Sequence, residues 1–268
     1  MGEDLPVQRT IEFAGKPWVV KNATEPMGPG PNYFSADERD VFVDDTGRLH
    51  LVLSERDGKW LCAELISDWP VGYGTYEFRL AGSADGSPGP DQLDPNVVLG
   101  LFTWDNESWQ TDANSEIDVE LTRWADPNSA NLHYSVHPVR GPHGIAEERT
   151  HAELIDLKGE GSTHVIHWRP DGVEFATYLG DDGPRPERLI CQWRYNAGHP
   201  KRTTNNAKGE LTDPIGVPRP HATTTARINL WLNNTDGTGL GDPPTDGKRV
   251  EVVLTGFTFT PVDTAETE

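Results

Sequence analysis

The sequence contains only two cysteines, Cys62 and Cys191, among its 268 residues. Two cysteines cannot form a disulfide framework, although one bond between them is possible. Both lie in strand-like runs, so we expect buried free thiols. Long hydrophobic runs are also missing, because no stretch of ~18 apolar residues could span a bilayer. Residues 1–6 show no basic run followed by an apolar stretch, so we expect no signal peptide in this chain.

Basic side chains are scarce, and lysine is the scarcer of the two kinds. The chain has 23 Lys and Arg against 43 Asp and Glu, a formal net charge of −20, and only seven of the 23 are lysine. A surface this negative repels phosphate backbones and anionic lipids, so we expect neither nucleic acid nor a membrane as a partner. An adaptation to high salt, which screens self-repulsion, and ordinary acidic drift both account for this excess.

Helical spacing is nearly absent, and apolar residues instead alternate with polar ones in many short runs. This period of two predicts strands, separated by turn signals such as Asp57-Gly58 and Asp171-Gly172. The expected strands span residues 49–54, 60–67, 74–80, 97–104, 116–122, 131–137, 164–168, 173–179, 226–232 and 250–260. So many strands without helices predict an all-β protein, a jelly-roll sandwich of two antiparallel sheets.

Three long polar segments, 81–96, 196–225 and 233–248, interrupt this rhythm. Loops of this length are uncommon in a compact domain unless they are disordered or surround a binding site. Each is followed at once by another strand of the same kind. We therefore expect a single domain over residues 1–268, with a core from about 13 to 260.

The most informative segment is Glu116-Ile117-Asp118-Val119-Glu120. On a strand the three acidic side chains share one face, while Ile117 and Val119 enter the core. Three carboxylates in one row repel each other unless the protein uses them. Glycoside hydrolysis is such a use, because it needs one ionised carboxylate and one protonated carboxylic acid beside the scissile bond.

Crowding of like charges suggests how these carboxylates divide the work. We expect Asp118 to share a proton with Glu116 and hold it in place, while the raised pKa of Glu120 keeps it protonated as the acid. The two glutamates would have to lean over the shorter Asp118 to reach the separation of about 5 to 5.5 Å of a retaining enzyme. The alternative is a solvated strand face in a very acidic protein.

The same segment resembles the signature of glycoside hydrolase family 16, the jelly-roll β-glucanases, lichenases, laminarinases, agarases and carrageenases. Further segments match that family in the right order: 73–79, 101–104, 131–134, 164–173 and 228–231. The resemblance implies a concanavalin A-like jelly roll with a substrate cleft on a concave sheet. It also implies that Glu116 is the nucleophile, Asp118 its helper and Glu120 the acid/base of a retaining mechanism.

A sugar-binding site combines aromatic rings, on which the sugar stacks, with charged groups that form hydrogen bonds. Phe102 and Trp104 share a strand face, and their family counterparts face the donor subsites; core burial is the alternative. Glu77 and Arg79 also share a face, and their counterparts in lichenases bind sugar hydroxyls, whereas the alternative is a plain surface ion pair. 

Five more residues are candidates for substrate binding. Asn229 and Trp231 form another pair on one face, with Trp231 as a stacking platform or a core residue. His133 matches a histidine found beside the acid/base in laminarinase-like members, although a lone histidine on a strand is more often structural. Trp109 and Trp124 flank the carboxylate strand, and we expect them at the rim of the cleft.

We therefore expect a retaining, endo-acting glycoside hydrolase of a β-linked polysaccharide, above all a β-1,3 or β-1,3-1,4 glucan. A transglycosylase and a non-catalytic, lectin-like jelly roll are the alternatives, and the intact order of carboxylates argues against the lectin. We expect a monomer without organic cofactor. Many family members hold a structural calcium through an Asp near the last strand, but residues 254–257 contain no acid, so we expect no metal. The resemblance implies a secreted enzyme, while the missing signal peptide leaves the cytoplasm as the alternative.

Overall fold

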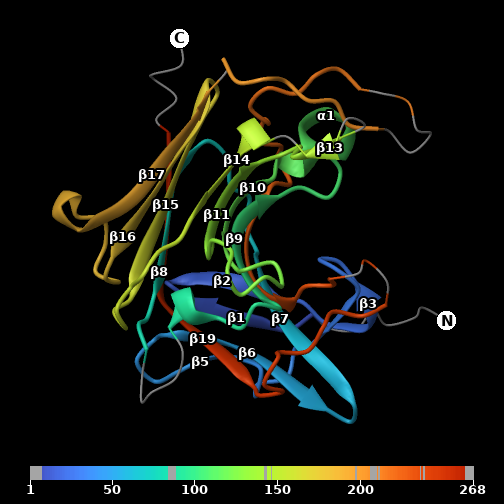
Figure 1. The fold of residues 1–268 in the computed structure, drawn as a ribbon, viewed down its shortest axis with the longest axis vertical. Coiled ribbons are helices and arrows are strands. Elements are labelled where there is room, and N and C mark those ends of the chain that lie inside the picture. Colours follow the sequence, from blue (N-terminus) through green and yellow to red (C-terminus); the bar gives the residue numbers. More distant parts are fainter. Residues whose placement is uncertain are drawn as a thin grey trace.

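The computed structural model is built almost entirely from β-strands, which follow one another in a continuous hydrogen-bonded ladder (Figure 1). The structure describes residues 8–83, 89–141, 144–145, 147–196, 198–205, 210, 212–235, 237 and 239–262. Residues 1–6, on which the prediction about a signal peptide rests, lie outside this part. No helix of the described residues is long and apolar enough to cross a membrane.

One sheet carries the predicted carboxylate row. Its order is β1 (Thr10–Phe13), β2 (Lys16–Val20), β7 (Lys59–Ser67), β18 (Thr225–Leu232), β9 (Val97–Trp104), β10 (Ile117–Leu121), β11 (Leu132–Val136) and β14 (Thr150–Glu153). All of these neighbours are antiparallel. We call it the carboxylate sheet.

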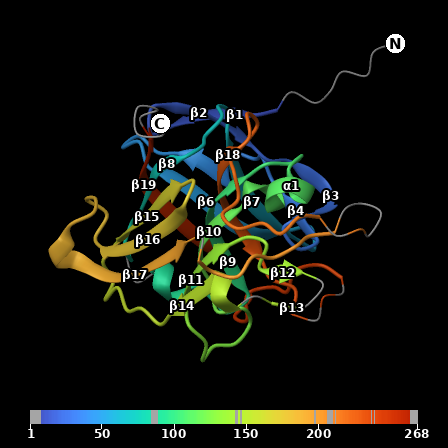
Figure 2. The ribbon, with the colours of Figure 1, turned by 90° about the horizontal axis from the view of Figure 1, so that it is seen from above.

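The second sheet lies behind the first and is also antiparallel. Its order is β5 (Val41–Val43), β6 (Leu49–Arg56), β19 (Val250–Pro261), β8 (Gly74–Leu80), β15 (Ser162–Arg169), β16 (Gly172–Leu179) and β17 (Leu189–Asn196). β17 lies on the far side of the molecule from α1 (Trp109–Asp112) and β3 (Ala23–Met27) (Figure 2). The remaining strands are β4 (Asn32–Phe34), β12 (Arg140–Gly141) and β13 (Gly144–Ile145).

The two sheets enclose an apolar core that the alternation of side chains produces. In β10, Ile117, Val119 and Leu121 are fully buried, and from β8 the side chains of Tyr76 and Phe78 meet them from the second sheet's side. Each of the ten expected strands is present, with ends within two residues of the expectation. The predicted all-β jelly roll is therefore confirmed, and Cys62 and Cys191 are free thiols, the first buried and the second half-buried.

Arg149 joins the second half of the chain to the carboxylate sheet. Its side chain is fully buried, and among the described residues it has no carboxylate partner. It donates instead to the hydroxyl of Tyr195 and to backbone carbonyls of Val136, His137, Pro200, Ile215 and Gly216. Since a buried cation is costly without partners, this set of acceptors is what makes the burial tolerable. It ties Pro200, Ile215 and Gly216 to the end of β11.

Replacing Arg149 by Met should therefore destabilise the fold strongly, because several buried carbonyls lose their donor at once. We expect a loss of about 3 kcal/mol or more in the free energy of unfolding, measured by urea denaturation. Arg169→Met is the matched control, because that exposed side chain reaches only a 4.0 Å contact with Glu174. Equal effects of the two substitutions would contradict this role of Arg149.

Candidate active site

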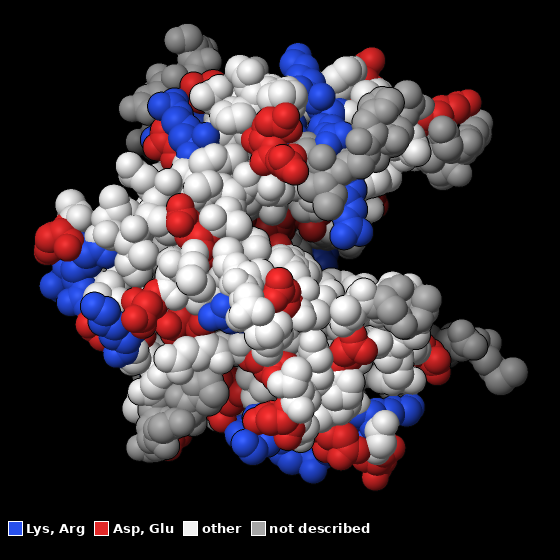
Figure 3. Space-filling view, in the orientation of Figure 1, with Lys and Arg blue, Asp and Glu red and all other residues white. Residues whose placement is uncertain are grey.

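The three acidic side chains lie on the outer face of the carboxylate sheet, as their spacing predicts. Across β10, Asp118 is opposite Phe102 of β9 and Ser135 of β11, and Glu120 is opposite Gly100 and His133. Asp118 is buried, while Glu116 and Glu120 are half-buried and reach solvent. The space-filling view shows a notch on the side of α1 and β3, with acidic atoms at its inner end (Figure 3).

A histidine that sequence reasoning missed links two of the carboxylates. His137 follows β11, and its Nδ1 lies 3.2 Å from Glu116 Oε2 while its Nε2 lies 3.1 Å from Asp118 Oδ2. Its backbone N–H donates to the carbonyl of Glu116 at 3.1 Å. His137 therefore takes the place between Glu116 and Asp118 where we expected a shared proton. The signal was present in the sequence, because His133, Ser135 and His137 alternate along the strand opposite the row.

Two further cations lie on this face of the sheet, around a buried glutamate. Glu64 of β7 is 1% exposed, and it accepts from Lys21 Nζ at 2.7 Å and from Arg227 Nη1 at 3.1 Å. The Arg227 guanidinium also lies over the Trp104 ring, 5.7 Å from its centroid. Because Arg227 is opposite Phe102, the neighbour of Asp118, it brings positive charge towards the carboxylate row.

Glu116 and Glu120 differ in pKa because they have different charged neighbours. Burial raises the pKa of Glu116 to about 8, and the Asp118 charge adds to this, but His137 and Arg227 oppose the shift. Burial also raises the pKa of Glu120, well above its usual value, and both Asp118 and Glu116 add to the shift while only His137 opposes it. Glu120 therefore keeps its proton more firmly, and Glu116 is the carboxylate that ionises first.

The carboxylates in turn charge the histidine. Burial by itself lowers the pKa of His137, yet Glu116, Asp118 and Glu120 together outweigh it and raise the pKa to about 9. An imidazolium is therefore the favoured form at neutral pH, and it stabilises an ionised Glu116 at 3.2 Å. Because these groups interact strongly, they titrate as a set.

An unusual turn delivers the chain to Glu116. Ala113, Asn114 and Ser115 have φ of 48°, 61° and 53°, so three consecutive residues other than glycine adopt the left-handed region. This conformation costs about 1–2 kcal/mol per residue. The Ser115 hydroxyl donates to the carbonyl of Arg219, and Asn114 Nδ2 donates to the carbonyl of Asp105. Backbone strain thus lies directly before the proposed nucleophile.

The predicted aromatic pair beside the row is in place. Phe102 and Trp104 lie on the same face as the carboxylates, with Phe102 8% exposed and Trp104 half-buried. The Trp104 indole N–H donates to Asn106 Oδ1 at 2.8 Å, which fixes the ring. Trp104 thus offers a partly exposed ring beside the carboxylate row, and Phe102 offers little surface.

A second aromatic group lies further along the sheet. Trp124 is 39% exposed, and its ring makes edge contacts with Trp231 and with His133, each at 6.1 Å between centroids. Trp231 is nearly buried, and His133 points its Nε2 at the carbonyls of Thr122 and Ala130. Burial lowers the pKa of His133, so it is neutral and supports Trp124 rather than the acid.

The two other candidates occupy different positions. Trp109 is 41% exposed on α1, and its indole N–H donates to the carbonyl of Asn205. Asn229 is buried, and its Oδ1 accepts from the backbone N–H of Gly100 at 3.1 Å. A Cβ on Gly100 would lie 2.4 Å from that oxygen, so glycine is required between Asn229 and the carboxylate row.

The prediction for Glu77 and Arg79 has to be corrected. Both lie on β8 in the second sheet, where they pair with each other on the face opposite Tyr76 and Phe78. Since the core lies between the sheets, these two side chains are on the opposite side of the sandwich from the carboxylates. On β7, which belongs to the carboxylate sheet, the side chain of Glu64 does lie on the same face as the carboxylates.

Glu116, Asp118 and His137 also form the one cluster of possible metal ligands found among the described residues, with ligand atoms within 4.8 Å of one another. The same residues form the two ion pairs of His137, so a cation would have to displace the proton on a ring nitrogen. The expectation that the protein works without metal or cofactor stays a prediction.

Comparisons with known proteins agree with this architecture. No protein-family profile and no curated protein sequence matches the chain. Solved structures do match: a β-glucanase of Bacillus licheniformis has 16% identity and a TM-score of 0.57, covering 91% of this chain and 92% of that one. A pseudo β-1,3-glucanase of Mycobacterium tuberculosis, also an immunostimulatory antigen, has 17% identity and a TM-score of 0.58, covering 92% and 91%.

A family 16 glycosyl hydrolase protein of Mycobacterium smegmatis matches with 15% identity and a TM-score of 0.53, covering 88% of this chain and 89% of that one. This chain has the fold of the family 16 glycoside hydrolases. At such identities the likeness shows a shared fold, and it agrees with the resemblance carried by residues 116–120.

Removing the imidazole of His137 should raise the pKa of Glu116. In His137→Gln the opposing positive charge is lost, so the pKa of Glu116 rises further and less of it is ionised at a given pH. We expect the acid limb of the pH profile of kcat/KM to shift to higher pH by about one unit. His50→Gln is the matched control, because His50 also lies between two carboxylates, Glu251 at 2.7 Å and Asp44 at 3.2 Å, but on β6 in the second sheet. An unchanged profile in His137→Gln would contradict this assignment.

The raised pKa of Glu120 should also appear in the stability of the fold. The folded state keeps this proton above the pH at which the unfolded chain loses it, about 4.3, so stability is lost as pH rises from there towards the folded pKa. Glu120→Gln removes this loss. We expect its Tm to exceed that of wild type by a margin that grows between pH 5 and pH 8, and Glu25→Gln on the exposed surface of β3 to show no such trend.

Proposed function

We propose that this protein is a retaining, endo-acting glycoside hydrolase of a β-linked glucan, with Glu116 as nucleophile and Glu120 as acid/base. The observation that carries the proposal is the division of acidity between these two glutamates. They share one face of the carboxylate sheet, and His137 and Arg227 oppose the rise of the Glu116 pKa, whereas only His137 opposes that of Glu120. Glu116 therefore loses its proton before Glu120, which is the order that a nucleophile and an acid of glycoside hydrolysis need.

In the first step, Glu120 donates its proton to the glycosidic oxygen while the Glu116 carboxylate attacks the anomeric carbon. The bond to the leaving sugar breaks, and a covalent glycosyl–enzyme forms at Glu116. In the second step, the Glu120 carboxylate takes a proton from water, whose oxygen attacks the anomeric carbon and releases Glu116. Two inversions at that carbon give net retention. Asp118 and Glu116 both pair with His137, and the imidazolium favours the ionised form of Glu116 and orients it.

The surroundings of the row support a long, neutral glycan as substrate. A chain that crosses β10, β9 and β18 would pass Trp104 and then the partly exposed guanidinium of Arg227. Trp109 and Trp124 stand exposed at the edges of this path. The notch opens at the side of the molecule in Figure 3, which favours binding in the middle of a chain. A monomer acting outside the cell fits such a polymeric substrate, and we propose both.

Two alternatives make different use of the same site. A transglycosylase would pass the glycosyl group from Glu116 to another sugar, and a lectin-like protein would bind glycan without cleaving it. Charged His137 beside Glu116 favours chemistry over binding alone, because a lectin has no need to make a buried carboxyl group more acidic. We therefore place hydrolysis first.

The two glutamates should each be indispensable. We expect Glu116→Gln and Glu120→Gln to abolish hydrolysis, with Tm little changed in the first and higher in the second, since only Glu116 loses an ion pair with His137. The measurement is the release of reducing ends from a panel of laminarin, mixed-linkage β-glucan, agarose, carrageenan and xyloglucan. Nuclear magnetic resonance of the first product should show the β-anomer, and an α-anomer would contradict retention.

The same panel separates the alternatives. Binding of a glucan by wild type without release of reducing ends would favour the lectin. Products longer than the substrate in the presence of an added oligosaccharide acceptor would favour the transglycosylase. Full activity in either glutamate variant would overturn the proposed roles.

A further inference from the structure

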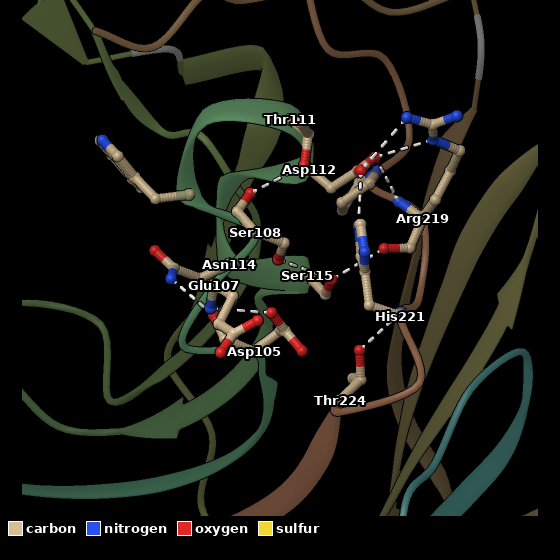
Figure 4. A network of polar contacts seen from close by, with 12 residues as sticks. Asp105, Glu107, Ser108, Thr111, Asp112, Asn114, Ser115, Arg219, His221 and Thr224 are labelled. Carbon is tan, nitrogen blue, oxygen red and sulfur yellow. Dashed lines mark hydrogen bonds and ion pairs between the residues drawn. The ribbon is translucent and has the colours of Figure 1, made fainter. Parts of the chain in front are cut away.

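The strained turn before Glu116 is held from outside by a buried carboxylate that the mechanism does not use. Asp112 ends α1, and its side chain is 3% exposed. Its Oδ1 accepts from the backbone N–H and the Nε of Arg219, both at 3.0 Å, and its Oδ2 lies 2.8 Å from His221 Nε2 (Figure 4). Burial raises the pKa of Asp112, but the hydrogen bonds from these two partners outweigh it and lower the pKa.

These contacts close a ring around the turn. Arg219 is bound by Asp112 on one side, and its carbonyl accepts the Ser115 hydroxyl at 2.7 Å on the other. The Ser115 carbonyl in turn accepts from Thr103 Oγ1 of β9 at 2.7 Å. Figure 4 shows Asp112 and Ser115 both directed towards the segment that carries Arg219 and His221. The three left-handed residues thus lie between two fixed points, one at each end.

Residues 219–221 are themselves held from the second sheet and from β9. The indole N–H of Trp168, a fully buried residue of β15, donates to the carbonyl of Pro218 at 3.1 Å. Thr223 donates to the carboxylate of Asp105, which follows β9. Asp112 therefore holds a segment that Trp168 anchors from the second sheet, while Asp105 contacts both this segment and the turn.

We propose that Asp112 is a positioning residue for the nucleophile: through Arg219 and His221 it holds Ala113–Ser115 in the left-handed region, and this fixes where Glu116 enters β10. Non-glycine residues leave that region when nothing over-determines it. Without the grip of Asp112, the turn relaxes and Glu116 moves away from His137. The inference rests on the proposed function for its kinetic part only.

The kinetic test compares two buried aspartates. In Asp112→Asn we expect kcat on laminarin or mixed-linkage β-glucan, whichever wild type hydrolyses, to fall about 100-fold, as for a misplacement on the order of 1 Å. KM should change by less than about threefold, because sugar-binding groups are untouched. Asp40→Asn is the matched control, because Asp40 is also buried and paired with an arginine, Arg56, but next to β6 in the second sheet. We expect it to lower Tm and leave kcat unchanged.

A second variant tests the strain itself. Ala113 is fully buried and has φ of 48°, and glycine adopts this conformation without steric cost. When Ala113→Gly is combined with Asp112→Asn, we expect part of the lost kcat to return. The double variant should have a kcat at least about tenfold higher than that of Asp112→Asn alone, as for strongly coupled sites. Losses that simply multiply would show that Asp112 does not act through the turn. Arg219→Gln, at a largely exposed side chain, replaces Asp112→Asn if that variant does not fold.

A crystal structure of Asp112→Asn provides a readout that needs no activity. We expect the separation between His137 Nδ1 and Glu116 Oε2, 3.2 Å in the wild-type chain, to lengthen, and Asp40→Asn to leave it unchanged. An unchanged separation together with an unchanged kcat would overturn the inference. If wild type cleaves no glycan of the panel, the proposed function fails, and the crystal structure alone still decides the role of Asp112.

Discussion

Like charges crowded on one strand face must be separated by protons or balanced by cations, and the neighbours of β10 supply both. Glu120, surrounded by carboxylates, keeps a proton. Glu116, beside His137 and within the influence of Arg227, is the one that can lose it. Neither state depends on a special property of glutamate. Each follows from burial and from the charges nearby, which are those of the other carboxylates, of His137 after β11 and, for Glu116, of Arg227 on β18.

The alternation of side chains along single strands was enough to predict the row of carboxylates and the sheet face on which it lies. Because side chains point to opposite faces in turn, residues 116–120 could be divided into a core side and a solvent side without knowing the fold. The same rule found the faces of Phe102 with Trp104 and of Asn229 with Trp231. It could not say which sheet a strand joins, and Glu77 with Arg79 shows the consequence: the pairing on β8 was correct and the side of the sandwich was wrong.

The residues whose roles could not be predicted from the sequence act through contacts between distant segments. His137 lies within the predicted strand 131–137, but its role needs the register between β10 and β11, which only the folded structure supplies. Arg149 and Asp112 reach partners 51 to 109 positions away, in a segment that appears in the sequence only as a long polar loop. Strands β1 to β5, β14 and β17 were missed because they are short or lie at edges, where a period of two covers too few residues to stand out.

The glycine at position 100 shapes the surface of the carboxylate sheet beside Glu120. Gly100 faces Glu120 on one side and Asn229 on the other, and the Asn229 side chain folds down onto its backbone. Even a single methyl group there would collide with that amide oxygen and lift it. The sheet surface beside Glu120 is therefore formed by the Asn229 amide rather than by a side chain of β9, because position 100 carries only a hydrogen atom.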